Sequence, residues 1–309
     1  MRQSRTAENP APAKHTPTRY GFVITKPLQL MVVLSLVEQL DRQISKDFLL
    51  VDNFAGAEPL HRQMLSRLDP GCRVFYFAEE RQAYAFAVRT GYDKLLIDSD
   101  VGFRRNLTIM AMAIRRPSMM LAVYEEGLGS YRLDLYPSAK RRALASVGCG
   151  VYFGGNWRTR EIYLFQPEKC VTPISARKIK LEKSISQLLA EKWGFLSEIF
   201  SAREYMENFT NLSNPGDCII YLTGWTVDEV RLATLARDGA SVIVKPHPHI
   251  KNIDSAKWGG CLSMAPANVP AEIIISAAAT SFRTVRVLHH GSSVGRYLQI
   301  DNVSFERVS

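Results

Sequence analysis

Short apolar runs alternate with longer segments of helical periodicity along most of the chain. The runs are rich in β-branched and aromatic residues, and in the first half they read YGFVIT (20–25), DFLLVDN, CRVFYF, KLLIDSD and MMLAVYEE. Each run is followed by a loop and then by a segment that fits a helix. This alternation is typical of βαβ units, in which crossover helices join parallel strands. Residues 20–165 are therefore predicted to form a Rossmann-like domain.

A second alternating set occupies the last third of the chain. Its predicted strands run into loops and read DCIIYLTG, ASVIVKPHPH and TVRVLHHGSS, and its predicted helices read TVDEVRLATLARDG, which Gly239 closes, and PAEIIISAAATSF. Residues 166–215 are first polar and basic and then helical in periodicity, which predicts a linker and bridging helices. We therefore expect an α/β protein whose second Rossmann-like domain covers residues 216–309. Its two parallel sheets should face an interdomain cleft at the carboxyl ends of their strands.

The ends and the cysteines of the chain bear on its location. Residues 1–19 are basic but lack the apolar core and cleavage site of a secretory signal, so we expect a disordered tail. The most apolar segment, residues 27–40, is shorter than the roughly 20 residues that span a bilayer, which favours a buried helix. The five cysteines are scattered without a CxxC pair, so neither a disulfide framework nor a zinc site is indicated. These features predict a cytoplasmic protein.

The net charge of +9 has three explanations: nucleic acid, anionic lipid or an anionic substrate. Basic pairs such as Arg104-Arg105 and Arg115-Arg116 are dispersed, and no nucleic-acid-binding signature lies beside them. Nucleic acid is therefore the weaker explanation, and we expect no nucleic-acid partner. An enzyme that meets anionic glycolipid at the inner face of a membrane would benefit from the same charge, which predicts peripheral membrane contact.

Two adjacent carboxylates emerge from the predicted strand MMLAVYEE. Glu125 and Glu126 come at its carboxyl end and are followed by Gly127 and Gly129, which permit close approach of the backbone. A general base is expected at this position. The competing interpretation is a solvated acidic turn.

His247 follows another predicted strand in the motif Pro246-His247-Pro248-His249. Proline fixes its own φ and restricts the residue before it, so the backbone around His247 is set in advance. Such stiffness suits an imidazole that meets phosphate. The alternative is a rigid exposed loop.

Further polar residues lie at strand ends and helix starts of the second domain. Ser292 and Ser293 precede a predicted helix, where they fit either an anion site or a plain N-cap. Glu272 lies in the first turn of the predicted helix PAEIIISAAATSF. It is either a charge that favours the helix dipole or a carboxylate that accepts hydrogen bonds from both hydroxyls of a ribose. Thr223 and Gly224 end the strand DCIIYLTG and are expected to line a nucleotide site on the ground of the fold alone.

In this order, an acidic-acidic-Gly loop, a His-Pro and a Ser-Ser resemble the motif set of bacterial sialyltransferases. The likeness is to the lipooligosaccharide sialyltransferase and capsule polysialyltransferase families, and it covers roughly residues 20–300. The opening YGFVITKPLQL is also similar to their first strand and Thr-Pro-Leu-Gln helix start. Here Lys26 separates the threonine from the proline.

The resemblance implies a GT-B transferase that inverts the anomeric carbon and needs neither a metal nor a cofactor. The donor would be CMP-sialic acid and the acceptor a surface glycan or glycolipid, in lipooligosaccharide or capsule synthesis. Glu125 would then be the base, with Glu126 as the alternative, and His247 would bind or protonate the departing phosphate. Of the remaining residues, Ser292 and Ser293 would hold that phosphate, Glu272 would take the ribose, and Thr223 and Gly224 would line the site.

Two other interpretations remain open. One is a related GT-B transferase with CMP-Kdo or a UDP-sugar as donor, and the other is a non-enzymatic regulator that binds nucleotides or nucleic acid. Asp98-Ser99-Asp100 resembles the DxD element of metal-dependent transferases. It ends a strand of the first domain, far in sequence from the phosphate residues, so we expect no metal site.

Overall fold

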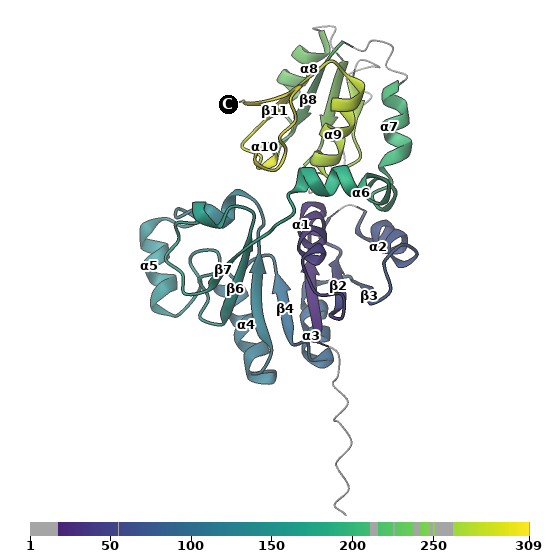
Figure 1. Cartoon of the computed structure of the whole chain (residues 1–309). Coiled ribbons are helices and arrows are strands. Elements are labelled where there is room, and N and C mark those ends of the chain that lie inside the picture. Colours follow the sequence, from purple (N-terminus) through teal and green to yellow (C-terminus); the bar gives the residue numbers. More distant parts are fainter. Residues whose placement is uncertain are drawn as a thin grey trace, which may run out of the picture.

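The computed structural model describes residues 18–54, 56–210, 216–224, 226–237, 241–247, 250 and 262–308. At residues 204, 208–210, 236 and 237 it describes the backbone alone. In this part of the chain the strands form two parallel sheets, the first within residues 19–180 and the second within 217–307 (Figure 1). The predicted fold class, α/β with two Rossmann-like domains, is confirmed. Most of the predicted tail, residues 1–17, lies outside the described residues.

The first sheet has seven strands in the order β3-β2-β1-β4-β5-β6-β7. They are β1 (Arg19–Ile24), β2 (Ser45–Val51), β3 (Cys72–Phe77), β4 (Lys94–Ile97), β5 (Met120–Tyr124), β6 (Thr159–Leu164) and β7 (Arg177–Lys180). All neighbouring strands are parallel. The order reverses between β1 and β4, so a crevice for ligands is expected at the carboxyl ends of these two strands.

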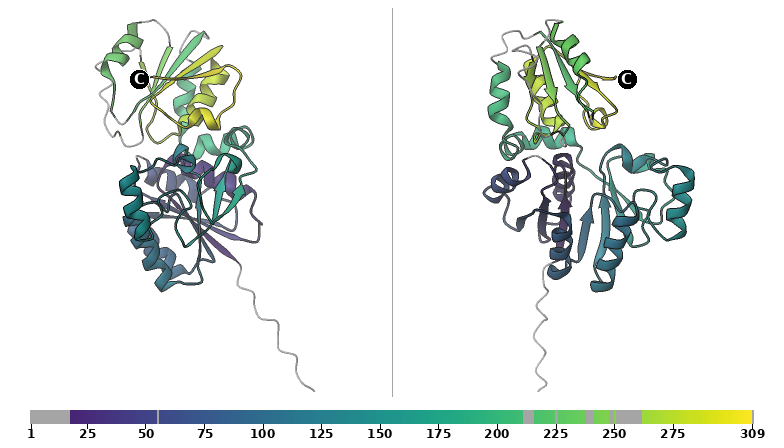
Figure 2. Two further views of the ribbon diagram at one scale, coloured as in Figure 1. Left: turned by 90° about the vertical axis from the view of Figure 1, so that its left-hand side faces the viewer. Right: turned by 180° about the vertical axis from the view of Figure 1, so that it is seen from behind.

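Helices cover both faces of this sheet (Figure 2). They are α1 (Pro27–Glu38), α2 (Ala57–Leu65), α3 (Glu80–Thr90), α4 (Phe103–Arg115) and, at the rim, α5 (Ser138–Ser146). Successive strand residues point to opposite faces. Phe22 packs in the apolar cluster that includes α1 and α2, whereas Val23 packs in the cluster that includes α3 and α4. As predicted, α1 begins at Pro27 and is buried along most of its length.

The second sheet has five parallel strands in the order β10-β9-β8-β11-β12. They are β8 (Asp217–Leu222), β9 (Ser241–Lys245), β10 (Leu262–Met264), β11 (Thr284–His289) and β12 (Val303–Arg307). The accompanying helices are α8 (Glu229–Arg237), α9 (Ala271–Ser281) and α10 (Val294–Tyr297). The order of this sheet reverses between β8 and β11, so its crevice lies at the ends of these strands. Gly239, predicted to close α8, lies outside the described residues.

Two helices, α6 (Ile185–Ile199) and α7 (Ala202–Thr210), connect the sheets. Ser184 caps α6 by accepting a hydrogen bond from the Gln187 backbone amide at 3.2 Å, and the Ser184 amide donates to the side-chain oxygen of Gln187 at 2.9 Å. Helix α6 packs against both α1 and α9, and one apolar cluster runs from Phe22 through Leu196 to Ile274. The two domains therefore share a continuous core at α6.

The segment 166–215, predicted as linker and bridging helices, also contains β7, so the first sheet extends beyond residue 165. This strand and β12 are edge strands that mostly expose their side chains, as in RKIK of β7. Edge strands lose the apolar signature that marks buried ones, which is why both are missing from the sequence prediction. None of the described helices is long and apolar enough to cross a membrane.

Candidate active site in the interdomain cleft

A cleft of about 310 Å³ lies between the domains at the carboxyl ends of their strands. The second domain lines it with residues that follow β8, β9 and β11 and with the start of α9, while the first domain contributes residues 26–28. All six residues predicted to bind the nucleotide belong to this lining: Thr223, Gly224, His247, Glu272, Ser292 and Ser293. The structure thus brings together residues up to 70 positions apart, because parallel strands end at one edge of the sheet. Their roles remain predictions.

His247 is held at the cleft by its neighbours. Its backbone amide donates a hydrogen bond of 2.9 Å to the hydroxyl of Thr223 at the end of β8. The amide of Thr223 in turn donates to the Lys245 carbonyl at 3.1 Å. Thr223 is largely buried, and its hydroxyl holds the backbone of His247 in place. His249 lies outside the described residues.

Two buried residues with ionisable side chains, Lys245 and Glu272, line the cleft. The Lys245 ammonium donates to the carbonyls of Pro246 at 2.9 Å and Ala267 at 3.1 Å, which ties the His247 loop to the turn before α9. Burial lowers the pKa of Lys245 to about 7, and burial raises the pKa of Glu272 to about 7. Each charge offsets part of the other's shift. Glu272 is 4% exposed, so a ribose in the cleft could contact only the small part of its side chain that the cleft exposes.

Ser292 and Ser293 differ in their surroundings. The Ser292 hydroxyl accepts the amide of Val294 at 3.2 Å, a local bond within the turn that precedes α10. The Ser293 side chain makes no capping bond and lies against Gly127 of the first domain. Helix α10 has only four residues, so it offers little helix dipole to a phosphate. The amides of Gly291 and Ser292 already donate to His289 Nδ1, so the hydroxyls are the main groups here that could meet a phosphate.

Glu125, predicted as the base, lies in the interior of the protein. Its side chain is fully buried, and its carboxylate accepts hydrogen bonds from the Phe165 amide at 2.8 Å, the Tyr297 hydroxyl at 2.8 Å and the Tyr131 hydroxyl. Burial raises its pKa, which these three bonds partly oppose. Because Tyr297 belongs to α10, this carboxylate joins the two domains. Glu125 is not among the residues that line the cleft, so this geometry favours the alternative, Glu126, and the choice of base remains a prediction.

We expect Tyr297→Phe to destabilise the chain by about 1.5 to 3 kcal/mol, because it removes a buried hydrogen bond to a charged acceptor. The matched control is Tyr20→Phe, since the ring of Tyr20 rather than its hydroxyl meets the Lys94 ammonium at 4.7 Å. Urea unfolding followed by tryptophan fluorescence would measure both. Equal stability of Tyr297→Phe and the wild type would contradict the interdomain role of Glu125.

Glu126, unlike Glu125, is partly exposed and borders a cavity. Its side chain is 27% exposed and forms an ion pair with Lys26. It lines a second cavity of about 360 Å³ in the first domain, together with Ser99, Ser130 and Tyr136. Burial raises the pKa of the Glu126 carboxyl, the nearby Asp98 raises it further, and Lys26 lowers it. A carboxylate with a raised pKa that borders a cavity is suited to accept a proton.

Lys26 connects the two cavities. It lies just before α1, lines the interdomain cleft and pairs with the carboxylate that lines the second cavity. Sequence reasoning noted Lys26 only as an interruption of a Thr-Pro motif, and it assigned no role to Lys245 or to His290, which also line the cleft. His290 bonds the Tyr221 hydroxyl at 2.7 Å. Lys26, Lys245 and His290 all lie at or just beyond the carboxyl end of a strand, and that position is a signal that could have identified them.

The two aspartates of the Asp98-Ser99-Asp100 element have different surroundings and different hydrogen-bond partners. Asp100 is fully buried and accepts from the amides of Gly154 and Asn156, both at 2.9 Å, and from the Thr159 hydroxyl at 2.7 Å. Asp98 accepts from the side-chain amide of Gln29 at 3.1 Å, and its carboxylate lies 3.4 Å from the Arg105 guanidinium. Asp100 thus organises the turn after β4. Among the described residues there is no group of three or more His, Cys, Asp or Glu that could hold a metal ion.

No protein-family model matches the chain, and no curated protein is significantly similar to it in sequence. Among solved structures, the UDP-GlcNAc 2-epimerase of Methanocaldococcus jannaschii, in complex with UDP-GlcNAc and UDP, is similar at a TM-score of 0.51. It is 13% identical over 94% of this chain and 83% of that chain. The chain has the GT-B fold.

Two more solved structures align with TM-scores of 0.45. The wall teichoic acid polymerase TagF is 11% identical over 90% of this chain, which spans 66% of the polymerase chain. Another UDP-N-acetylglucosamine 2-epimerase is 10% identical over 90% of this chain and 74% of that chain. At these identities the similarity concerns the fold, and the chemistry has to be argued from the site.

Proposed function

We propose that this chain is an inverting glycosyltransferase that moves sialic acid from CMP-sialic acid to a glycan acceptor of the lipooligosaccharide or capsule type. The observation that carries the proposal is the cleft. One wall holds the six predicted nucleotide residues, and the opposite wall holds Lys26, paired with a carboxylate that borders a separate cavity. In this proposal donor and acceptor occupy distinct cavities, with an acid–base group between them.

In the proposed reaction, an acceptor hydroxyl in the cavity beside Glu126 attacks carbon 2 of the sialyl group. The new carbon–oxygen bond forms as the bond from carbon 2 to the CMP phosphate breaks. Glu126 takes the proton of the hydroxyl, and His247 donates a hydrogen bond or a proton to the departing phosphate. Ser293 and Ser292 are placed to add hydroxyl contacts to that phosphate.

Lys26 supports both halves of this reaction. As a cation that lines the nucleotide cleft, it can offset phosphate charge. As the partner of Glu126, it lowers the pKa of that carboxyl and so favours the ionised form that accepts a proton. We therefore treat Lys26 as a residue that couples donor binding to the base.

The test is binding and hydrolysis with defined nucleotides. Calorimetry should show that CMP binds the full chain and UMP binds more weakly, and CMP-sialic acid should release CMP slowly without an acceptor. The fold shared with an epimerase solved with UDP-GlcNAc makes UDP-sugars the main alternative donors. Preference for UMP, or for CMP-Kdo over CMP-sialic acid, would retain the transferase and replace the donor. Binding of none of these would overturn the proposal.

We expect activity to survive a chelator, changing by no more than about twofold in EDTA. A catalytic Lewis acid would supply several kcal/mol, so its loss would be far larger. The expectation rests on Asp100, whose carboxylate is occupied by two amides and a hydroxyl and is buried away from the cleft. Loss of turnover in EDTA that manganese restores would instead assign the metal to a site that includes Asp98.

A further inference from the structure

Helix α4 exposes a continuous apolar stripe. Four large apolar side chains, each between 42% and 80% exposed, follow one another at spacings of four, three and four residues: Phe103, Leu107, Met110 and Ile114. This spacing places them on one face of the helix. The opposite face, with Asn106, Ile109 and Met112, is buried against the sheet. The stripe is therefore not needed to hold α4 on the domain.

Cations border the stripe. A groove of about 430 Å³ between α4 and α5 is lined by Phe103 and by Arg104, Arg105 and Lys140. Arg105 is paired with Glu80, whereas Arg104 and Lys140 are exposed. Helix α5 adds Arg141 and Arg142, buries none of its residues, and like α4 contains no acidic residue. The surface around the stripe is thus strongly cationic.

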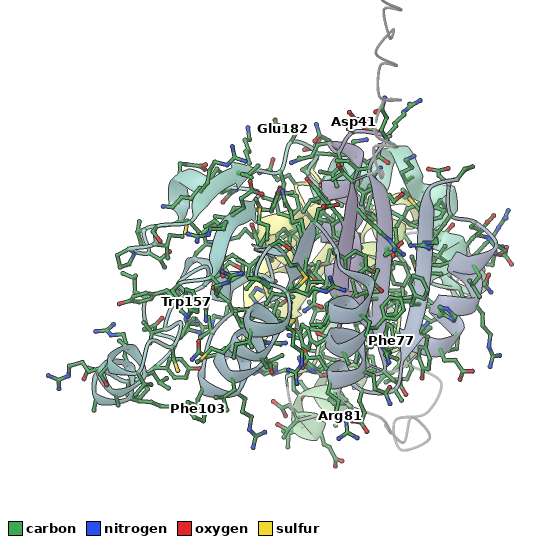
Figure 3. The ribbon with its side chains drawn as sticks, turned by 90° about the horizontal axis from the view of Figure 1, so that it is seen from below. Asp41, Phe77, Arg81, Phe103, Trp157 and Glu182 are labelled. Carbon is green, nitrogen blue, oxygen red and sulfur yellow. The ribbon has the colours of Figure 1, made fainter. Side chains whose placement is uncertain are left out.

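An exposed tryptophan extends the same surface. Trp157 is 55% exposed, and it lies in the same half of the view from below as Phe103 (Figure 3). The loop that carries Trp157 is attached to α4, because the Asn156 side chain donates to Asn106 at 2.9 Å. Tryptophan beside basic and apolar residues is typical of the membrane interface.

The cationic groove leads toward the proposed base. Val101 and Tyr136 line both this groove and the cavity that holds Glu126. A molecule anchored at the α4–α5 surface can therefore extend along one line of cavities to the carboxylate.

We propose that α4, α5 and Trp157 form a docking surface for an anionic phospholipid membrane, and that a lipid-anchored acceptor reaches Glu126 along the groove. The second part rests on the proposed function, whereas the first does not. The charge argues for a membrane over a second copy of the chain. A two-fold dimer would set the arginines and lysines of the two stripes against each other, while anionic headgroups complement them.

The test is flotation of the full chain with vesicles of phosphatidylethanolamine and about 30% phosphatidylglycerol, in low and high salt. Wild type should float with these vesicles and detach in salt. The double variant L107E/I114E should lower the bound fraction about tenfold or more, because both side chains lose apolar burial. The control is Val230→Glu on α8, because Val230 and Ile114 are both 80% exposed. Equal loss in both variants, or none in L107E/I114E, would overturn the proposal.

Charge and self-association are tested separately. R104Q/K140Q should weaken vesicle binding by roughly fivefold per cation removed, while R42Q/R286Q, at exposed positions elsewhere, should not. Binding that is equally strong to pure phosphatidylcholine vesicles would exclude recognition of anionic lipid. Sedimentation of the wild type that shows a dimer, absent in L107E/I114E, would assign the stripe to a second copy instead.

A last measurement separates this surface from the enzyme's chemistry. If both proposals hold, L107E/I114E should release CMP from CMP-sialic acid at the wild-type rate but transfer sugar more slowly to an acceptor embedded in vesicles. Vesicle binding without any donor turnover would leave the docking surface standing and remove the proposed function. Unchanged transfer to the embedded acceptor, with vesicle binding lost, would contradict the acceptor route.

Discussion

Glu126→Gln is expected to lower turnover by roughly 10² to 10⁴-fold while CMP binding is retained, or strengthened where the released Lys26 meets the phosphate. The amide keeps the size of the side chain but cannot accept the acceptor's proton. Glu126 faces the cavity of the first domain rather than the nucleotide wall, so CMP has no direct contact to lose. Steady-state rates with CMP-sialic acid, measured beside CMP calorimetry, would test this expectation.

The adjacent residue provides the control. Glu125→Gln makes the same chemical change one position away, in a buried carboxylate that joins the domains. It should lower the free energy of unfolding, but in the protein that remains folded its turnover should fall much less than in Glu126→Gln. If Glu125→Gln abolished turnover in stably folded protein and Glu126→Gln did not, the base would be Glu125.

The pH profile gives an independent measure of Glu126. A base acts when deprotonated, so the rate should fall as the pH drops through its pKa, which burial and Asp98 raise. Lys26 lowers this pKa, so Lys26→Met should raise it and move the acidic limb of the profile to higher pH. An acidic limb that stays in place in Lys26→Met would mean that the ion pair does not govern the base.

Much of the site follows from local sequence patterns. Apolar runs mark where buried strands end, and parallel strands carry their functional residues at the carboxyl ends. Thr223, His247 and Ser292 were therefore predicted to share one cleft from the runs that precede them, and the structure brings them together. The same reasoning fails for exposed edge strands, as β7 and β12 show, because their apolar signal is lost to solvent.

Local sequence patterns do not decide whether Glu125 or Glu126 is the better candidate for the base. Both follow β5, and the sequence around them is equally compatible with either role. Their environments are set by distant partners: Tyr297 lies 172 residues from Glu125, and Lys26 lies 100 residues from Glu126. Such contacts depend on how the two domains pack, which no local periodicity records. Lys26 illustrates this limit: the local sequence predicts its position before α1, but it does not predict the ion pair with Glu126.

His247→Ala is expected to lower turnover by about 10²-fold or more, as for removal of a general acid or of a positioned phosphate partner. Its backbone should stay in place, because the amide of residue 247 still meets the Thr223 hydroxyl. The loss therefore isolates the imidazole. CMP release from CMP-sialic acid without an acceptor should fall in the same proportion, since the departing phosphate is the group that His247 serves.

His249→Ala is the matched control, from the same Pro-His-Pro-His loop but beyond its second proline. We expect it to cost much less, because His249 lies beyond the second proline of the motif, away from the stretch that the two prolines fix around His247. A donor with a better leaving group supplies a second check, because it needs less help from an acid. The defect of His247→Ala should shrink with such a donor, whereas that of Glu126→Gln should persist. Equal losses in the two histidine variants, or a His247→Ala defect that ignores the leaving group, would remove the acid role from His247.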